Sequence, residues 1–149
     1  MASRFPLQSL LEHSRHRMEA AERMLRILKR KEEAARRRLD ELRGYQRDYQ
    51  QRLTGDAGAQ GMAIHLLRDY HAFLGKLEVA LRHQKSEVDQ AAAHWQLAHD
   101  NWLALRQKVK AYETLAERHR HDEQEREEKR DQRLTDEQAA RISNSKAAL

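Results

Sequence analysis

The stretch Thr54-Gly-Asp-Ala-Gly-Ala-Gln-Gly61 contains three of the five glycines of the chain, and almost no helix-breaking residue occurs on either side of it. Clustered glycines end helices and form turns. We therefore expect a first helix over about 5–53, a turn over about 54–62 and a second helix over about 63–118.

The composition agrees with a helical chain. Of the 149 residues, 36% are charged and 39% hydrophobic, whereas an average globular domain has about a quarter charged residues. One proline and five glycines are too few for the turns of a β-rich or α/β fold. The absence of cysteine excludes disulfides, thiolate zinc sites and a cysteine nucleophile. This composition is typical of a long helix or a coiled coil.

Both expected helices carry a heptad repeat of apolar residues. In the first, Leu7 stands at d and Leu11 at a, and eleven of the fourteen a and d positions are apolar. In the second, with Leu67 at a, fifteen of the sixteen a and d positions from Ala63 to Ala116 are apolar. Sustained a/d seams with charged flanks predict a coiled coil.

The two helices are expected to pair with each other, because a short loop makes its flanking helices antiparallel neighbours. A turn centred on Gly58 places Glu32, the only carboxylate of the first seam, opposite Gln84, the only polar residue of the second. The same register places the small Ala21 opposite the large Trp95. This matching favours an all-α fold, a long two-helix antiparallel coiled-coil hairpin that is a monomer when isolated.

The seam of the second helix fades after Ala116, and in this register Tyr112 would face Arg4 near the start of the chain. Residues 119–149 have many charges and no apolar stripe. We therefore expect a helical extension that frays in the isolated protein or is ordered by a partner. The single expected domain covers 1–149, with this extension as its last part.

No motif of an enzyme, a cofactor site or a metal site occurs in the chain. The phosphate-binding, dinucleotide-binding, nucleophile-elbow and zinc-protease signatures are all absent. Two close histidine pairs, His13 with His16 and His119 with His121, lack carboxylates that converge on them by spacing. Two helices also do not enclose a pocket of the usual size for a substrate. We expect no catalytic activity, no cofactor and no metal.

No segment approaches the ~20 apolar residues of a membrane span. Near the N-terminus, Glu12, His13 and Arg15 interrupt a short apolar run, so it does not resemble a signal peptide. We therefore expect a cytoplasmic protein.

Seven basic residues form a belt midway along the first helix, off the a/d seam: Arg26, Lys29, Arg30, Lys31, Arg36, Arg37 and Arg38. The belt is either a solvated face or a docking surface for an acidic partner. Nucleic acid is a poor fit, because base stacking requires aromatic residues among the cations and the belt has none.

The aromatic residues Tyr45 and Phe73 both occupy g positions, which face each other in an antiparallel pair. Leu66 and Ala80 lie on the same edge. We expect an apolar strip outside the seam, in the half of the hairpin near the loop. The strip either shields the seam or contacts a partner.

Five segments resemble, in order, those of the FliJ family, which are small cytoplasmic proteins of the bacterial flagellar type III export apparatus. Residues 4–11, RFPLQSLL, are similar to the family opening F-x-L-Q-x-L-L. Residues 44–53 resemble its Y-x-x-x-Y segment, and residues 70–80 its Y-x-x-F-x-x-x-L-E-x-A segment. Residues 112–118 and 134–141 resemble its L-x-E-R and D-E-x-A-x-R tail. The similarity covers nearly the whole chain.

The resemblance implies an antiparallel coiled coil similar to the stalk of rotary ATPases. It implies a stalk that inserts in the ring of the export ATPase, promotes ring assembly, contacts the cytoplasmic domain of the export gate and binds export chaperones. Such a protein serves flagellum biogenesis, motility and chemotaxis, and it associates with the inner membrane only through its partners. The gate-contact surface of the family corresponds here to Tyr45, Tyr49, Phe73, Leu77 and Ala80.

Three alternatives remain open at the level of sequence. The nearest is the equivalent stalk of a virulence type III secretion system, which shares the hairpin and the task. The second is a nucleic-acid-binding hairpin that uses the basic belt, which a salt-dependent shift of DNA or RNA would support. The third is a homodimeric structural coiled coil in which both seams pair between chains.

Overall fold

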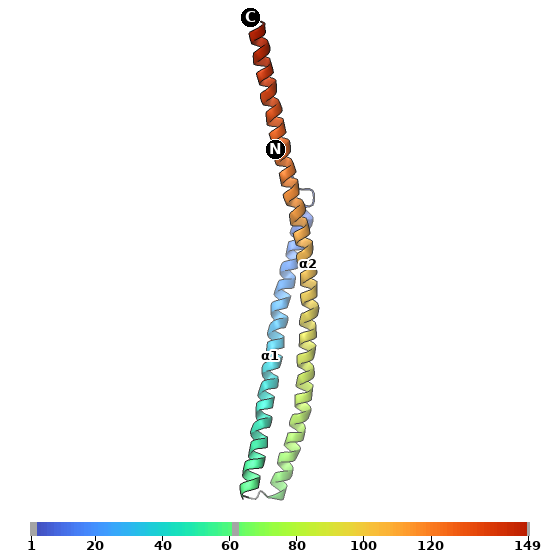
Figure 1. The fold of residues 1–149 in the computed structure, drawn as a ribbon. Coiled ribbons are helices and arrows are strands. Elements are labelled where there is room, and N and C mark those ends of the chain that lie inside the picture. Colours follow the sequence, from blue (N-terminus) through green and yellow to red (C-terminus); the bar gives the residue numbers. More distant parts are fainter. Residues whose placement is uncertain (1–2, 61–62, 149) are drawn as a thin grey trace. The chain divides into compact units, whose positions relative to one another are not determined.

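The computed structural model describes residues 3–60 and 63–148, and it contains two helices, α1 (Gln8–Gln60) and α2 (Ile64–Ala147) (Figure 1). No strand occurs within these two described ranges. The all-α fold expected from composition and heptad spacing is confirmed. The chain divides into two compact units, each of which contains part of both helices.

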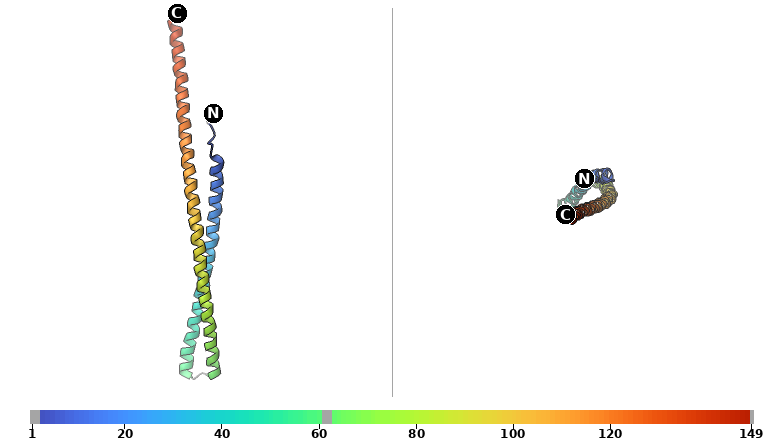
Figure 2. Two further views of the ribbon diagram at one scale, coloured as in Figure 1. Left: turned by 90° about the vertical axis from the view of Figure 1, so that its right-hand side faces the viewer. Right: turned by 90° about the horizontal axis from the view of Figure 1, so that it is seen from above.

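The first unit, Ala20–Trp102, is called the hairpin unit here. Within it α1 and α2 lie side by side in opposite directions (Figures 1 and 2). Its buried apolar side chains all come from the expected a and d positions, namely Ala21, Leu39, Leu42, Leu77 and Val88. Burying these side chains between the helices stabilises the pair, because a two-helix unit has no other core.

The second unit, called the terminal unit here, combines Met1–Glu19 with Leu103–Leu149. Leu11, Leu105 and Val109 are its buried apolar residues. The N–H of Gln8 donates to the carbonyl of Phe5 at 3.1 Å, a turn that leads the described N-terminal residues into α1. Here too the buried residues stand at a and d positions, so the two seams extend through this unit.

The expected end of the first helix at 53 is wrong. α1 continues through Gly55 to Gln60, and the expected turn over 54–62 is helical as far as that residue. A helical glycine costs about 1 kcal/mol relative to alanine. Intrinsic helix propensity only weakly determines where a helix ends, and here α1 continues despite the glycines. Residues 61–62, the rest of the expected turn, lie outside the described residues.

The expected pairing of Glu32 with Gln84 is also wrong. Gln84 Nε2 instead donates to the backbone carbonyl oxygen of Ala35, at 3.0 Å. Glu32 is buried, and its carboxylate pairs along its own helix with Lys29 Nζ at 3.6 Å and Arg36 Nη2 at 2.9 Å. Glu32 and Gln84 are therefore each satisfied by a different partner.

Trp95 shows the size of the difference in register. Its ring has Lys29 Nζ 5.1 Å from the centroid, whereas the turn centred on Gly58 placed Ala21 opposite it. The facing position on α1 is thus displaced by about one heptad. The physical reason is the longer first helix. Because α1 continues to Gln60 and α2 begins at Ile64, a later part of α1 lies against each residue of α2.

The tail of α2 is helical to Ala147. Because of the shifted register the seam reaches Glu123, which is buried beneath the N-terminal segment, and does not stop near Ala116. From Glu128 onward every described residue is exposed. Whether the extension expected over 119–149 frays in the isolated protein stays a prediction.

Candidate functional site

An aromatic cluster lies in the hairpin unit near the ends of the two helices that flank residues 61–62. The ring of Tyr49 contacts that of Phe73 at 4.5 Å between centroids and that of Tyr70 at 6.1 Å. The guanidinium carbon of Arg52 lies 5.7 Å from the Tyr49 centroid. Tyr49 is half-buried at d, so it holds the rings of α2 against the seam while one edge of the cluster faces water.

Four of the five residues expected at the gate-contact surface are accessible. Tyr45 is 51% exposed and Phe73 42%, Ala80 is exposed and Tyr49 is half-buried. Leu77 is buried in the seam, where its side chain supports the helices. Aromatic side chains with this much exposed apolar surface are common anchors of protein interfaces.

The expected facing pair of Tyr45 and Phe73 differs from what the structure contains. The neighbour of Phe73 on α1 is Tyr49, one helical turn further along. The shifted register again accounts for this difference. Tyr45 and Phe73 still occupy g positions, so they line the same edge of the hairpin unit. Leu66, which is 43% exposed, lies on this edge as well.

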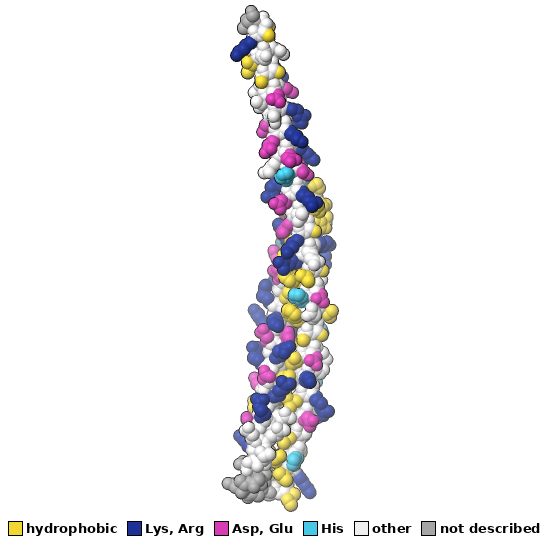
Figure 3. All heavy atoms as spheres, in the orientation of Figure 1, with side chains coloured by type: hydrophobic (Ala, Val, Ile, Leu, Met, Phe, Trp, Pro, Cys, Tyr) yellow, Lys and Arg dark blue, Asp and Glu magenta, His cyan; other side chains and the backbone are white. Residues whose placement is uncertain are grey.

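All seven residues of the basic belt are exposed. Figure 3 shows dark blue side chains gathered along the middle of α1. Glu32 forms ion pairs with Lys29 at 3.6 Å and with Arg36 at 2.9 Å. Glu41 forms an ion pair with Arg38 at 3.3 Å. The other four residues have no ion-pair partner among the described residues: Arg26, Arg30, Lys31 and Arg37.

The sequence analysis did not predict that the rings of Trp95, His99 and Trp102 form a row along one face of α2. The ring of His99 stacks on that of Trp95 at 5.0 Å, with an interplanar angle of 26°, and lies 5.7 Å from that of Trp102. The indole N–H of Trp102 donates to Glu22 Oε1 at 3.3 Å. The i, i+4, i+7 spacing was the signal, because residues at that spacing share one helix face.

In the terminal unit, the N-terminal segment covers a buried carboxylate. The backbone N–H of Ser3 donates to Glu123 Oε2 at 3.4 Å, and His119 Nε2 lies 3.0 Å from the Ser3 carbonyl oxygen. The rings of Phe5 and His119 lie 5.7 Å apart. Hydrogen bonds from Ser3, with help from the charges of Arg126 and His119, hold the pKa of Glu123 below its ordinary value.

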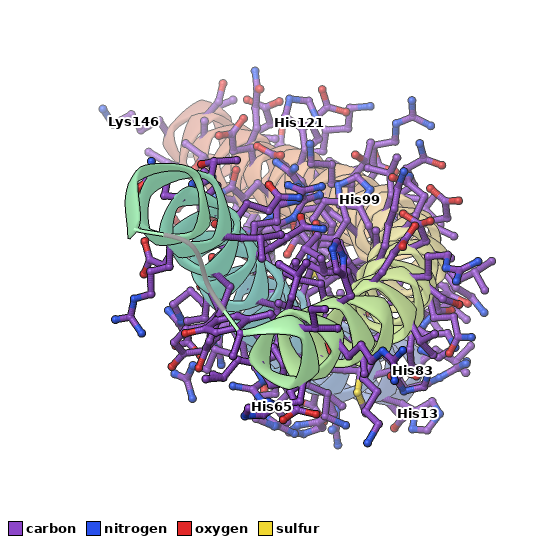
Figure 4. The ribbon with its side chains drawn as sticks, turned by 90° about the horizontal axis from the view of Figure 1, so that it is seen from below. His13, His65, His83, His99, His121 and Lys146 are labelled. Carbon is purple, nitrogen blue, oxygen red and sulfur yellow. The ribbon has the colours of Figure 1, made fainter. Side chains whose placement is uncertain are left out.

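The histidines of the hairpin unit do not gather at one point. His65, His83 and His99 are spread along α2 (Figure 4). In the terminal unit, His121, Asp122 and Glu125 place three donor atoms within 4.8 Å of one another. All three side chains are exposed, and exposed acidic groups at this spacing are common on helices without a metal.

In the parts of the chain that the structure describes, neither helix has an apolar stretch long enough to cross a membrane. The arrangement of both units is that of a coiled-coil protein whose accessible features are an aromatic edge, a basic belt and an unpaired helical tail.

Comparison with known proteins agrees with this class. Residues 3–148 match the family described as flagellar FliJ protein. The chain is 28% identical over 146 residues to the flagellar FliJ proteins of Escherichia coli (strain K12) and Salmonella typhi, and each match covers 98% of this chain and 99% of the relative. No solved structure gives a significant match. The chain belongs to the FliJ family, which associates it with flagellum biogenesis and protein export.

Proposed function

We propose that the protein is a non-enzymatic component of the flagellar type III protein export apparatus. It acts as a coiled-coil stalk that inserts in the ring of the export ATPase and promotes assembly of that ring. It also links the ring to the export gate and to substrate chaperones. It works in the cytoplasm and reaches the inner membrane through these partners alone. Family membership and the two-helix fold support this proposal.

One observation carries the assignment of the gate contact. Tyr45 and Phe73 expose about half of their surfaces on one edge of the hairpin unit, although each could have been shielded by the opposite helix. Exposed apolar surface of this kind gains free energy when a partner covers it. Ala80 is exposed about two turns after Phe73, and Tyr49 contacts Phe73 from the seam.

A binding measurement with the isolated cytoplasmic domain of the export gate tests the assignment. The double variant Tyr45→Ala with Phe73→Ala should bind the gate domain more weakly by about 2 kcal/mol or more, if these rings are interface anchors. Val79→Ala is the matched control, because Val79 is also exposed on α2 of the same unit. Unchanged affinity of the double variant would show that the gate contact lies elsewhere.

The family match favours the flagellar apparatus over the equivalent stalk of a virulence system. The belt is the observation that favours a nucleic-acid-binding role as the second candidate. A salt-dependent mobility shift of DNA or RNA, lost when the unpaired cations of the belt are reversed, would support that role.

A further inference from the structure

Two apolar side chains of α1 point away from the seam in the hairpin unit. Met24 is 49% exposed and Ile27 is 48% exposed, and the two lie one turn apart on the same face. Their neighbours Leu25 and Leu28 stand at a and d positions and are half-buried in the seam. The apolar face formed by Met24 and Ile27 is therefore additional to the one that the hairpin uses.

A groove between the two helices begins beside this face. It has a volume of about 210 Å³, and its lining includes Lys31 on α1 and Gln90 and His94 on α2. Ile27 lies one turn before Lys31, and Leu97, which is 69% exposed, lies about one turn after His94. Because the helices are antiparallel, Ile27 and Leu97 flank the same end of the groove.

Basic residues border this apolar surface. Arg23, Arg30 and Lys31 are four residues before, three after and four after Ile27, so all three are its neighbours on the helix surface. None of them has an ion-pair partner among the described side chains of residues 3–55 and 63–148, in contrast to Lys29, which pairs with Glu32. One carboxylate, Glu87, lines the groove, and it lies 3.7 Å from His83.

We propose that this surface binds an amphipathic helix of another protein, one whose apolar face is bordered by aspartate or glutamate. The Ile27 surface consists of Met24, Ile27, Leu97, Arg23, Arg30 and Lys31. A helix fits because an amphipathic helix can lay its apolar face into an apolar groove on a protein surface. Acidic borders fit because they would pair with cations that have no partner within the described chain.

The Ile27 surface is separate from the proposed gate contact. Ile27 and Tyr45 are eighteen residues apart on α1, which is about 27 Å along a helix. Nucleic acid is disfavoured because the centre of the surface is aliphatic and offers no ring for base stacking. A second copy of this chain would bring like charges together around Ile27, which is unfavourable. The proposal does not depend on the proposed function.

Binding of two synthetic peptides to the full-length protein tests the proposal. Both peptides are fluorescein-labelled helices with leucine at a and d, and they have either glutamate or lysine at e and g. Fluorescence anisotropy should show tighter binding of the glutamate peptide. Ile27→Glu should weaken that binding about tenfold or more, whereas Val79→Glu, at an exposed aliphatic position on α2 outside this surface, should leave it unchanged.

A charge reversal makes the test independent of peptide hydrophobicity. The double variant Arg30→Glu with Lys31→Glu should lose the glutamate peptide and gain the lysine peptide. Circular dichroism at 222 nm establishes that each variant keeps the helicity of the unmodified protein. Equal binding of both peptides, or full binding by Ile27→Glu, would overturn the proposal.

Two further outcomes would name a different occupant and also overturn it. One is tighter binding of a labelled single-stranded DNA of 20 nucleotides that the Arg30 and Lys31 reversal abolishes. The other is a dimer in sedimentation velocity that Ile27→Glu converts to a monomer.

Discussion

Gln84 of α2 donates a hydrogen bond through Nε2 to the backbone carbonyl oxygen of Ala35 on α1, at 3.0 Å. Gln84 is the one polar residue among the a and d positions of α2 from Leu67 to Ala116. Its acceptor lies in the interior of a helix whose backbone groups already bond to one another. The bond therefore links the two helices at one position, and it leaves no backbone group unpaired when it is removed. It favours the observed register over one displaced by a heptad.

Gln84→Ala should lower the free energy of unfolding by about 1 kcal/mol, which is the usual net value of one hydrogen bond. Urea unfolding followed by circular dichroism measures the change. Gln90→Ala is the matched control, since Gln90 is an exposed glutamine two turns further along the same helix. Equal effects of the two substitutions would mean that the bond to Ala35 does not stabilise the pair.

Trp95→Ala should cost about 2–3 kcal/mol, below the ~3–5 kcal/mol of a fully buried aromatic residue. Trp95 is half-buried because only one opposing helix covers it, and its ring lies near the ring of His99 and the ammonium group of Lys29. Leu77→Ala, at a buried position of the same unit, should cost at least as much despite the smaller side chain. Urea unfolding of both variants checks this order.

Glu123 should make the stability of the terminal unit dependent on pH. Its pKa in the folded protein lies below the ordinary value because Ser3 donates hydrogen bonds to the carboxylate and Arg126 attracts its charge. The stabilisation is therefore complete above the pKa of the unfolded chain and is lost as the pH falls through the lower, folded value. Once corrected for the intrinsic exchange rate at each pH, amide exchange of residues 3–19 should accelerate as the pH falls below about 4.5, the ordinary pKa of a glutamate.

The variant Glu123→Gln separates this effect from general acid unfolding. It should exchange faster than the unmodified protein at pH 7, and the difference should shrink as the pH falls, once each rate is corrected for intrinsic exchange. Glu128→Gln, at an exposed position nearby, should show no difference at either pH. A difference for Glu123→Gln that does not change with pH would contradict the assignment.

The heptad pattern was sufficient to predict the helices and their seams. Every buried apolar residue of the two units stands at a predicted a or d position, as Leu39 and Val109 illustrate. The register was not predictable from this pattern, because a displacement of one heptad leaves every a position opposite a d position. The turn was predicted from the glycine stretch. The cost of about 1 kcal/mol per glycine is too small to end a long helix, because helix formation is cooperative.

The candidate site was predictable to the same extent. Exposure of Tyr45 and Phe73 follows from their g positions, which do not depend on register. Contacts between helices do depend on it, so the packing of Tyr49 on Phe73 was missed. The covering of Glu123 by Ser3 was missed for the same reason, because the expected register had no residue left to face that part of α2.

Amide exchange should be fast in the tail of the isolated protein from about Glu128 onward. Every described residue there is exposed, and a helix without tertiary contacts is marginal in water. Residues 104–123 should exchange more slowly, because Leu105, Val109 and Glu123 are buried within the terminal unit. Slow exchange through 128–147 in the isolated protein would show that the tail is ordered without a partner.

Removal of residues 128–149 should separate the two proposed activities of the protein. The shortened chain keeps the contacts of Ser3 with Glu123 and of Phe5 with His119, so both units should fold. The exposed tail packs on no other part of the described chain, so any role it has requires contact with another molecule. We expect this tail to be needed for stimulation of the export ATPase. Gate binding should survive this truncation, whereas Tyr45→Ala with Phe73→Ala should weaken gate binding and spare ATPase stimulation. ATPase assays and gate-domain binding on the same two variants measure both activities. If each variant loses both activities while its helicity is unchanged, the two contacts are not separable and the adaptor mechanism is wrong.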